Sequence, residues 1–391
     1  MSTALGGTYA PRFAPVADLL ERNLADGTDL GASVCVVHDG EVVVDLWGGM
    51  QDGAGRSWQR DTLVNVYSLS KTATAMAALA LVDRGLLDLD APVARYWPEF
   101  GAAGKQGVLV RHVLSHTSGV AGWRERVSVD DVCDVPASSA LLAAQEPWWE
   151  PGTASGYHAL NYGHLVDALV RRVDGRALGA WFADEIAHSL GADFHLGVGP
   201  DEDDRIAPLV APPPTGFDYG ALDPESVFVK TMTNPLVPIP VTSSRQWRAA
   251  GIGAAGGHGN ARSVAAVNTP VSHAGMGLGG VRVLSAETVE RVFEPHSDGV
   301  DAVLGAPVRF GPGFALGGGR LHPSIPQQRA CWWTGYGGSI VVNDADRRLT
   351  FAYVMNRMEP ELLGSPRTDG YVSAVYDSLG DRVTASVGAA D

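Results

Sequence analysis

Two side chains at the start of one apolar segment could carry out nucleophilic chemistry. Ser68 and Lys71 stand three residues apart, and residues 69–85 are rich in alanine and leucine, which predicts a buried helix that ends near Gly85. Residues three apart share a helix face, so the lysine amine would lie beside the serine hydroxyl. A helix N-terminus favours negative charge, which suits a serine that becomes an alkoxide. The pair predicts a serine nucleophile with a lysine base.

The lysine strengthens this interpretation because the chain has only three lysines, Lys71, Lys105 and Lys230. Burial lowers the pKa of a lysine from about 10.4 and makes its amine a usable base near neutral pH. A capping serine beside a lysine that reaches solvent would explain the same four-residue pattern. The rest of the chain has to decide between the two.

Composition restricts the classes of function. The chain has 391 residues, of which 45% are hydrophobic and 19% charged, as in an ordinary globular protein with a substantial core. Its formal net charge of −15 argues against nucleic acid or an anionic membrane as a partner. Cys35, Cys133 and Cys331 are odd in number and lack metal-ligand spacing, so we expect reduced thiols.

The sequence also carries no targeting or membrane signal. Its first residues lack an apolar run of signal-peptide length, and no later run approaches the ~18 apolar residues of a membrane span. We therefore expect a cytoplasmic protein. The sequence does not indicate an oligomeric state.

Hydrophobic patterns predict an α+β fold with one antiparallel sheet built from both chain ends. Two hairpins are expected, at 32–47 around Asp39-Gly40 and at 339–355. Residues 1–90 and 280–391 would form the sheet domain, and 91–279 a mainly helical domain, with the active site between them. The irregular stretch 199–240 would be a wall or lid of the site. Helices are expected at 15–25, 160–173, 258–267, 285–293 and 370–379.

Two further segments could complete a site. Tyr157 stands between a Pro-Gly loop and a helix, where a half-buried packing role is the alternative interpretation. Trp333-Thr334-Gly335 comes just before a strand, and Tyr336 follows it. Glycine lets the backbone approach a ligand closely, so this run could offer an N–H to an oxyanion, although a bulge is the alternative.

Other patterns fail on inspection. Residues 251–256 match a dinucleotide-binding glycine pattern, but no strand precedes them and no acidic residue follows at the required distance. His112 and His116 have zinc-protease spacing without the glutamate. The chain lacks a Gly-x-Ser-x-Gly elbow, which disfavours an α/β-hydrolase. No metal or organic cofactor is expected.

Taken in order, the motifs resemble the serine β-lactamase-like family of class C β-lactamases, D-alanyl-D-alanine carboxypeptidases and family VIII carboxylesterases. Ser68-Leu69-Ser70-Lys71 matches its S-x-x-K motif, Tyr157-His158-Ala159 matches Y-x-N in its tyrosine, and Trp333-Thr334-Gly335 stands where K-T-G belongs. The segments 85–90 and 112–119 also resemble the family. The resemblance implies a β-lactamase/transpeptidase-like fold.

The same resemblance implies the roles of the site residues. Ser68 would be the nucleophile, and Lys71 and Tyr157 would share its proton, with the choice of primary base left open. The backbone N–H groups of Ser68 and Tyr336 would form the oxyanion hole.

Two departures favour the esterase branch. Ala159 replaces the asparagine and Trp333 the lysine, which removes charge-assisted bonds worth about 1.5–3 kcal/mol each to an anionic substrate. We therefore predict hydrolysis of small neutral esters, with short acyl chains as in the esterase relatives. Substrate contacts are expected from Trp149, Ala159, Trp333 and Gly335, with core or rim packing as an equal alternative for Trp149. A β-lactamase, a D-Ala peptidase, an acyltransferase and a non-catalytic penicillin-binding sensor remain the alternatives.

Overall fold

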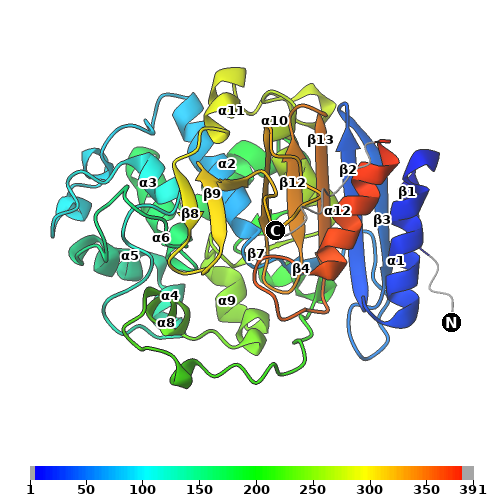
Figure 1. Cartoon of the computed structure of the whole chain (residues 1–391), viewed down its shortest axis with the longest axis horizontal. Helices are drawn as coiled ribbons and strands as arrows, with labels where there is room; N and C mark the ends of the chain where they lie inside the picture. The colour runs from blue at the N-terminus through cyan, green and yellow to red at the C-terminus, as the bar shows by residue number, and fades with distance from the viewer. Residues whose placement is uncertain (1–4, 381–391) are drawn as a thin grey trace, which may run out of the picture.

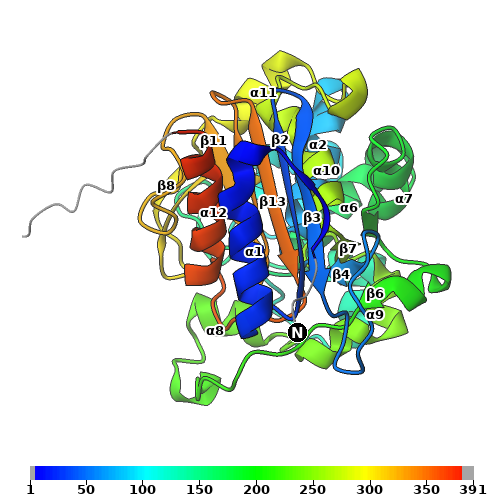
Figure 2. The ribbon, with the colours of Figure 1, turned by 90° about the vertical axis from the view of Figure 1, so that its right-hand side faces the viewer.

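The central element of the computed structural model, which describes residues 5–380, is a nine-stranded antiparallel sheet (Figures 1 and 2). Its strand order is β1-β3-β2-β13-β12-β11-β10-β9-β8, so the two chain ends meet where β2 pairs with β13. This confirms the predicted fold class and the sheet built from both ends. The strands are β1 (Gly6–Tyr9), β2 (Gly31–His38), β3 (Glu41–Gly49), β8 (Ser297–Val300), β9 (Pro307–Gly311), β10 (Phe314–Leu316), β11 (Ala330–Thr334), β12 (Ile340–Asp344) and β13 (Leu349–Met355).

Both predicted hairpins are present in this sheet. Asp39 and Gly40 join β2 to β3 with φ values of 52° and 82°, left-handed conformations that favour an Asp-Gly turn. Strands β8 to β11 were not predicted, because runs of three to five residues carry too little periodicity to identify. Trp333 and Thr334, which were expected just before a strand, are themselves the last two residues of strand β11, and β12 follows after a turn.

Helices cover both faces of the sheet. Helices α1 and α12 pack against each other on one face, and α10 packs against β2, β12 and β13 on the other (Figure 2). The helices are α1 (Ala14–Asp26), α2 (Ser70–Asp83), α3 (Val110–Leu114), α4 (Val129–Cys133), α5 (Val135–Ala144), α6 (Asn161–Val173), α7 (Leu178–Phe182), α8 (Val227–Thr233), α9 (Arg245–Ala250), α10 (Ala261–Ser272), α11 (Ala286–Val292) and α12 (Pro366–Ser378). Within the described residues, no helix has both the length and the apolar composition needed to cross a membrane.

The predicted helices are present, with two shifted starts: the helix expected from residue 370 begins at Pro366. The helix expected from residue 258 begins at Ala261, because residues 257–259 form a strand of a second, small sheet. That sheet has the order β5 (His195–Leu196), β7 (Gly257–Gly259), β4 (Leu63–Asn65), β6 (Ile206–Ala207). The division into two domains stays a prediction, and α10, within the predicted helical region, lies on the large sheet.

The buried helix α2 occupies the centre of the molecule. It contacts α6, α7, α10 and α11, and its alanine-rich sequence lets these neighbours approach closely. The turn between β9 and β10 also reaches it: a methyl group on Gly313, whose φ is 89°, would lie 2.3 Å from the Cβ of Ala75. Helix α2 is therefore held both by its neighbouring helices and by a turn of the large sheet.

Candidate active site

Ser68 lies in the turn that leads from strand β4 into helix α2. Tyr67, just before it, has a φ of 45°, a left-handed conformation that is strained for a tyrosine. The N–H of Tyr67 donates to Oδ1 of Asn65 at 3.1 Å, and the N–H of Lys71 donates to the Ser68 carbonyl at 3.0 Å. These bonds hold the turn and leave the serine partly exposed at the helix mouth.

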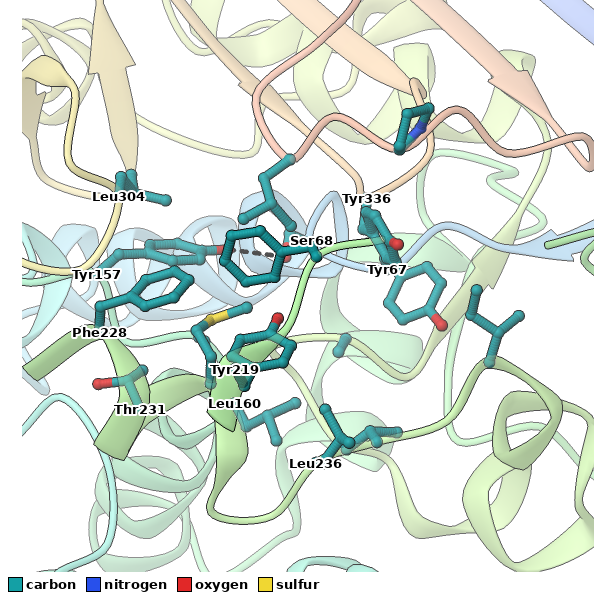
Figure 3. A pocket seen from close by; sticks show the side chains of 18 of the residues that line it. Tyr67, Ser68, Tyr157, Leu160, Tyr219, Phe228, Thr231, Leu236, Leu304 and Tyr336 are labelled. Carbon is teal, nitrogen blue, oxygen red and sulfur yellow. Dashed lines mark hydrogen bonds between the residues drawn. The ribbon is translucent and has the colours of Figure 1, made fainter. Parts of the chain in front are cut away.

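Three predicted residues meet at the Ser68 hydroxyl (Figure 3). The Tyr157 hydroxyl donates to Oγ of Ser68 at 2.7 Å, and Nζ of Lys71 lies 3.2 Å from the same oxygen. Lys71 and Tyr157 are only 1% and 7% exposed. The lysine amine also lies over the tyrosine ring, 4.6 Å from its centroid. The structure thus brings together side chains that are 89 residues apart in the sequence.

The surroundings of Lys71 favour its neutral form. Burial lowers the pKa of Lys71 well below its ordinary value, and no carboxylate in the described residues forms an ion pair with it. Its N–H groups donate to the carbonyl oxygens of Ala159 at 2.8 Å and Ala254 at 2.9 Å. A neutral amine has two N–H bonds, so both are used and its lone pair is left for the Ser68 hydroxyl.

Ala254 is a contact that the sequence did not indicate. It lies in the glycine-rich segment 251–256, where Gly253 packs against helix α2: a methyl group there would lie 2.6 Å from Oγ1 of Thr74. The Thr74 hydroxyl donates to the Gly253 carbonyl at 2.7 Å. This segment therefore brings a carbonyl acceptor to Lys71.

Tyr157 is buried and remains a phenol. Burial is the largest influence on its pKa and raises it above the usual value of 10, while the bond to Ser68 acts in the opposite direction. Its backbone N–H donates to Oδ1 of the buried Asp301 at 3.0 Å. The rings of Tyr157 and Trp333 pack with centroids 5.1 Å apart. The tyrosine is held from its backbone and from its ring.

His116 supports Tyr157 and was missed as a site residue. Its backbone carbonyl accepts the N–H of Gly156 at 2.9 Å, and its Nδ1 accepts the N–H of His158 at 3.1 Å. Its ring packs against Tyr157 with centroids 5.0 Å apart, and its φ is 61°. Burial lowers the pKa of His116 well below its usual value, so the ring is neutral and Nδ1 can accept. The resemblance of segment 112–119 to the family was the available signal.

The predicted oxyanion donors are free to donate hydrogen bonds to a ligand. Within residues 5–380, neither the N–H of Ser68 nor that of Tyr336 donates to a protein acceptor. Gly335 lets the two segments meet, because a methyl group there would lie 2.2 Å from the Val66 carbonyl oxygen. The Tyr67 and Tyr336 rings lie 5.6 Å apart. The turn after β11 therefore packs directly against the turn that carries Ser68.

The predicted substrate contacts differ in their positions. Ala159 and Trp333 line the pocket at Ser68, whereas Gly335 is not among the lining residues and packs against the Val66 carbonyl. A substrate contact by Trp149 stays a prediction: it is not among the lining residues of this pocket, and its Nε1 donates to the Ala154 carbonyl at 2.9 Å. The ring of Trp149 packs on Gly156, where a methyl group would lie 2.3 Å away. Trp149 therefore supports the loop before Tyr157.

The pocket at Ser68 has a volume of about 930 Å³ and an uncharged lining. Among the described residues, no Asp, Glu, Lys, Arg or His side chain lines it. The expected wall at 199–240 is present, since residues 215–239 supply much of the surface. The lining consists of Tyr67, Ser68, Tyr157, Ala159, Leu160, Thr215, Gly216, Phe217, Tyr219, Phe228, Thr231, Met232, Pro235, Leu236, Val237, Pro238, Ile239, Ala255, Leu304, Trp333, Tyr336, Pro360, Leu362 and Leu363.

Comparison with known proteins places this arrangement in a family. The family model described as Beta-lactamase matches residues 16–374. The chain belongs to the beta-lactamase family. This confirms the resemblance stated from the three motifs.

Several members of the beta-lactamase family are similar over nearly the whole chain. Esterase/beta-lactamase LipL of Mycobacterium tuberculosis is 32% identical over 364 residues, which cover 90% of this chain and 83% of that protein. The crystal structure of a family VIII carboxylesterase is 37% identical, with a TM-score of 0.89 over 96% of this chain and 100% of that one. EstA from Arthrobacter nitroguajacolicus Rue61a is 32% identical, with a TM-score of 0.85 over 97% and 99%. These matches confirm the β-lactamase/transpeptidase-like fold.

Proposed function

We propose that this protein is a serine carboxylesterase that hydrolyses neutral esters through an acyl-enzyme on Ser68. The observation that carries the proposal is the uncharged pocket that opens on the Ser68 hydroxyl. Lys71 and Tyr157 both contact this hydroxyl. A β-lactam or peptide carboxylate would meet no cationic side chain in this lining, whereas a neutral ester needs none. The names of the esterase relatives support the same reaction.

In acylation, Lys71 would act as the base. Nζ of neutral Lys71 takes the Ser68 proton while Oγ forms a bond to the ester carbonyl carbon. The carbonyl oxygen becomes an oxyanion, which the N–H groups of Ser68 and Tyr336 stabilise. The ammonium so formed keeps its bonds to the carbonyls of Ala159 and Ala254.

Tyr157 would return the proton to the leaving alcohol. Its hydroxyl lies 2.7 Å from Oγ of Ser68, and Nζ of Lys71 lies over its ring. The hydroxyl therefore donates its proton to the departing alkoxide as the C–O bond breaks, and it regains a proton from the Lys71 ammonium. In deacylation, water attacks the acyl carbonyl carbon while Lys71 takes its proton, and that proton then passes to Oγ of Ser68 as the acyl C–O bond breaks. The product acid is released and Ser68 recovers its proton.

Initial rates on p-nitrophenyl acetate, measured beside a chromogenic cephalosporin, test the function. We expect ester turnover in the wild type and its loss in Ser68→Ala, with little turnover of the cephalosporin. Ser57→Ala, at an exposed serine, is the matched control. Cephalosporin turnover equal to that of the ester would replace the proposal with a β-lactamase. A folded protein inactive on both, yet labelled stably by a penicillin at Ser68, would be a sensor module.

A further inference from the structure

One wall of the pocket carries a cluster of aromatic rings. Phe217, Tyr219 and Phe228 contact one another, with centroid distances of 5.0 Å, 5.9 Å and 6.2 Å for the three pairs. Trp333 and Tyr336 also line the pocket. In Figure 3, Phe228 lies on the same side of Ser68 as Tyr157, and Tyr336 lies on the other side. Aromatic surface therefore lies on both sides of the nucleophile.

The pocket mouth is apolar where protein surfaces are usually polar. Phe217 is 58% exposed, Leu236 is 55% exposed and Leu362 is 37% exposed, and all three line the pocket. They are three of the eight large hydrophobic side chains that the described residues expose. Exposed hydrophobic side chains that gather at one place mark a site for an apolar ligand.

The size and rigidity of the pocket also favour a bulky apolar ligand. Its volume of about 930 Å³ lies near the upper end of the range of roughly 300–1,000 Å³ for pockets that enclose drug-sized molecules. Pro235, Pro238 and Pro360 form part of the lining, and proline restricts backbone motion. A short aliphatic ester would leave most of this preformed apolar volume to water.

We infer that the preferred substrates are neutral esters that carry a bulky aromatic group, in place of the short acyl chains that the family resemblance implied. This inference rests on the proposed esterase function. The aromatic group would occupy the volume bordered by Phe217, Tyr219 and Phe228, because aromatic rings pack favourably edge-on or offset against one another. The ester carbonyl would remain at Ser68. The nucleophile and its proton-transfer partners act identically on small and large esters, so the preference arises from binding.

Unactivated esters of similar chemical reactivity separate this inference from the function. Acid release from ethyl acetate, ethyl octanoate, ethyl 3-phenylpropanoate and 2-phenylethyl acetate gives kcat/KM for each. We expect at least one phenyl ester to exceed ethyl acetate by about tenfold or more, as one additional apolar group in a fitted pocket does, and to exceed ethyl octanoate. Equal rates on all four would overturn the inference and leave the esterase standing. A clear preference for octanoate would overturn it in favour of linear chains, and no turnover of any ester would reject the function itself.

Variants of the aromatic cluster test its assignment. In Phe228→Ala, we expect the ratio of kcat/KM for the preferred phenyl ester to that for ethyl acetate to fall severalfold. Tyr9→Ala removes a ring that is 44% exposed and outside the pocket lining, so the same ratio should match the wild type. A ratio unchanged in both Phe228→Ala and Phe217→Ala would place the aromatic group elsewhere and overturn the assignment. Because ratios are compared within one variant, partial unfolding does not affect the result.

Discussion

Nδ1 of His116 accepts the backbone N–H of His158 at 3.1 Å, and the carbonyl of His116 accepts the N–H of Gly156. One residue thus binds the N–H groups of the residues before and after Tyr157 while its own ring packs against the tyrosine ring. The backbone of His116 is left-handed at this position, with a φ of 61°. His116 is a positioning residue for the tyrosine hydroxyl.

Replacing His116 should therefore impair turnover more than binding. In His116→Ala, we expect kcat to fall by about 100-fold with little change in KM, since misplacing a catalytic group by about 1 Å has an effect of that size. His116→Asn should recover much of kcat, because asparagine offers an acceptor oxygen and tolerates positive φ. His188→Ala, at a side chain that is 74% exposed, is the control. Equal kcat in His116→Ala and the wild type would show that Tyr157 is held without it.

The pH dependence of kcat/KM reports on Lys71. The base must be neutral, so kcat/KM should fall about tenfold per pH unit once the pH drops below the pKa of Lys71. Since burial lowers that pKa, the acidic limb should lie well below the pH range in which ordinary lysines titrate. Burial raises the pKa of Tyr157, so no alkaline limb from the phenol should appear below pH ~10.

Lys71→Arg is the companion measurement, because arginine keeps its charge throughout this pH range. We expect activity to be lost at every pH in this variant. An acidic limb that coincides with ordinary lysine titration would contradict the assignment of Lys71 as a neutral base.

The close approach of Gly335 to Val66 predicts the effect of one methyl group. In Gly335→Ala, the new methyl would meet the Val66 carbonyl oxygen at 2.2 Å, so the turn carrying Tyr336 must move away from Ser68. Loss of one oxyanion donor lowers kcat by roughly 100- to 1,000-fold, and we expect a decrease of that order. Gly107→Ala is the matched control, because nothing lies within 4 Å of its added methyl. Wild-type kcat in Gly335→Ala would exclude Tyr336 from the oxyanion hole.

A buried ion pair joins helix α12 to the segment between helix α1 and strand β2. Asp29 accepts hydrogen bonds from Arg367 at 3.0 Å and from the hydroxyl of Tyr371 at 2.8 Å, and both charged side chains are at most 1% exposed. Arg367→Met leaves the Asp29 carboxylate without its cation, which should lower the free energy of unfolding by about 3–5 kcal/mol. Urea denaturation measures this change.

The control for that measurement is Arg329→Met, at an arginine that is 44% exposed and pairs with Glu290 and Asp346. Exposed pairs contribute about 0–1 kcal/mol, so its denaturation midpoint should stay close to that of the wild type. Equal losses in the two variants would mean that the Asp29 pair carries no special stability.

Local patterns were enough to predict helix α2 and the pairing of Lys71, in its first turn, with Ser68 just before the helix. An i, i+3 spacing fixes Ser68 and Lys71 on one face whatever the rest of the chain does. The hairpin at Asp39-Gly40 was equally readable, because its turn residues set the backbone conformation.

Contacts between distant segments could not be derived in this way. Tyr157 reaches Ser68 because the segment 156–158 is bonded to His116, and no local pattern expresses that bond. Trp149 shows how composition leaves two roles open: an aromatic side chain near a site motif could contact the substrate or pack in the core, and here its ring packs on Gly156. The pocket wall at 215–239 was located only as irregular sequence, since its shape depends on the residues it faces.

Lysine is scarce in this chain, and its three side chains lie in very different environments. Lys71 and Lys105 are buried, whereas the side chain of Lys230 is 38% exposed. Lys230 belongs to helix α8, on which Phe228 and Thr231 face the pocket. Reagents directed at lysine amines would therefore attach beside the pocket wall. Immobilising the protein through lysine would hold it by helix α8, and a fluorophore at Lys230 would lie two residues from Phe228 of the pocket lining.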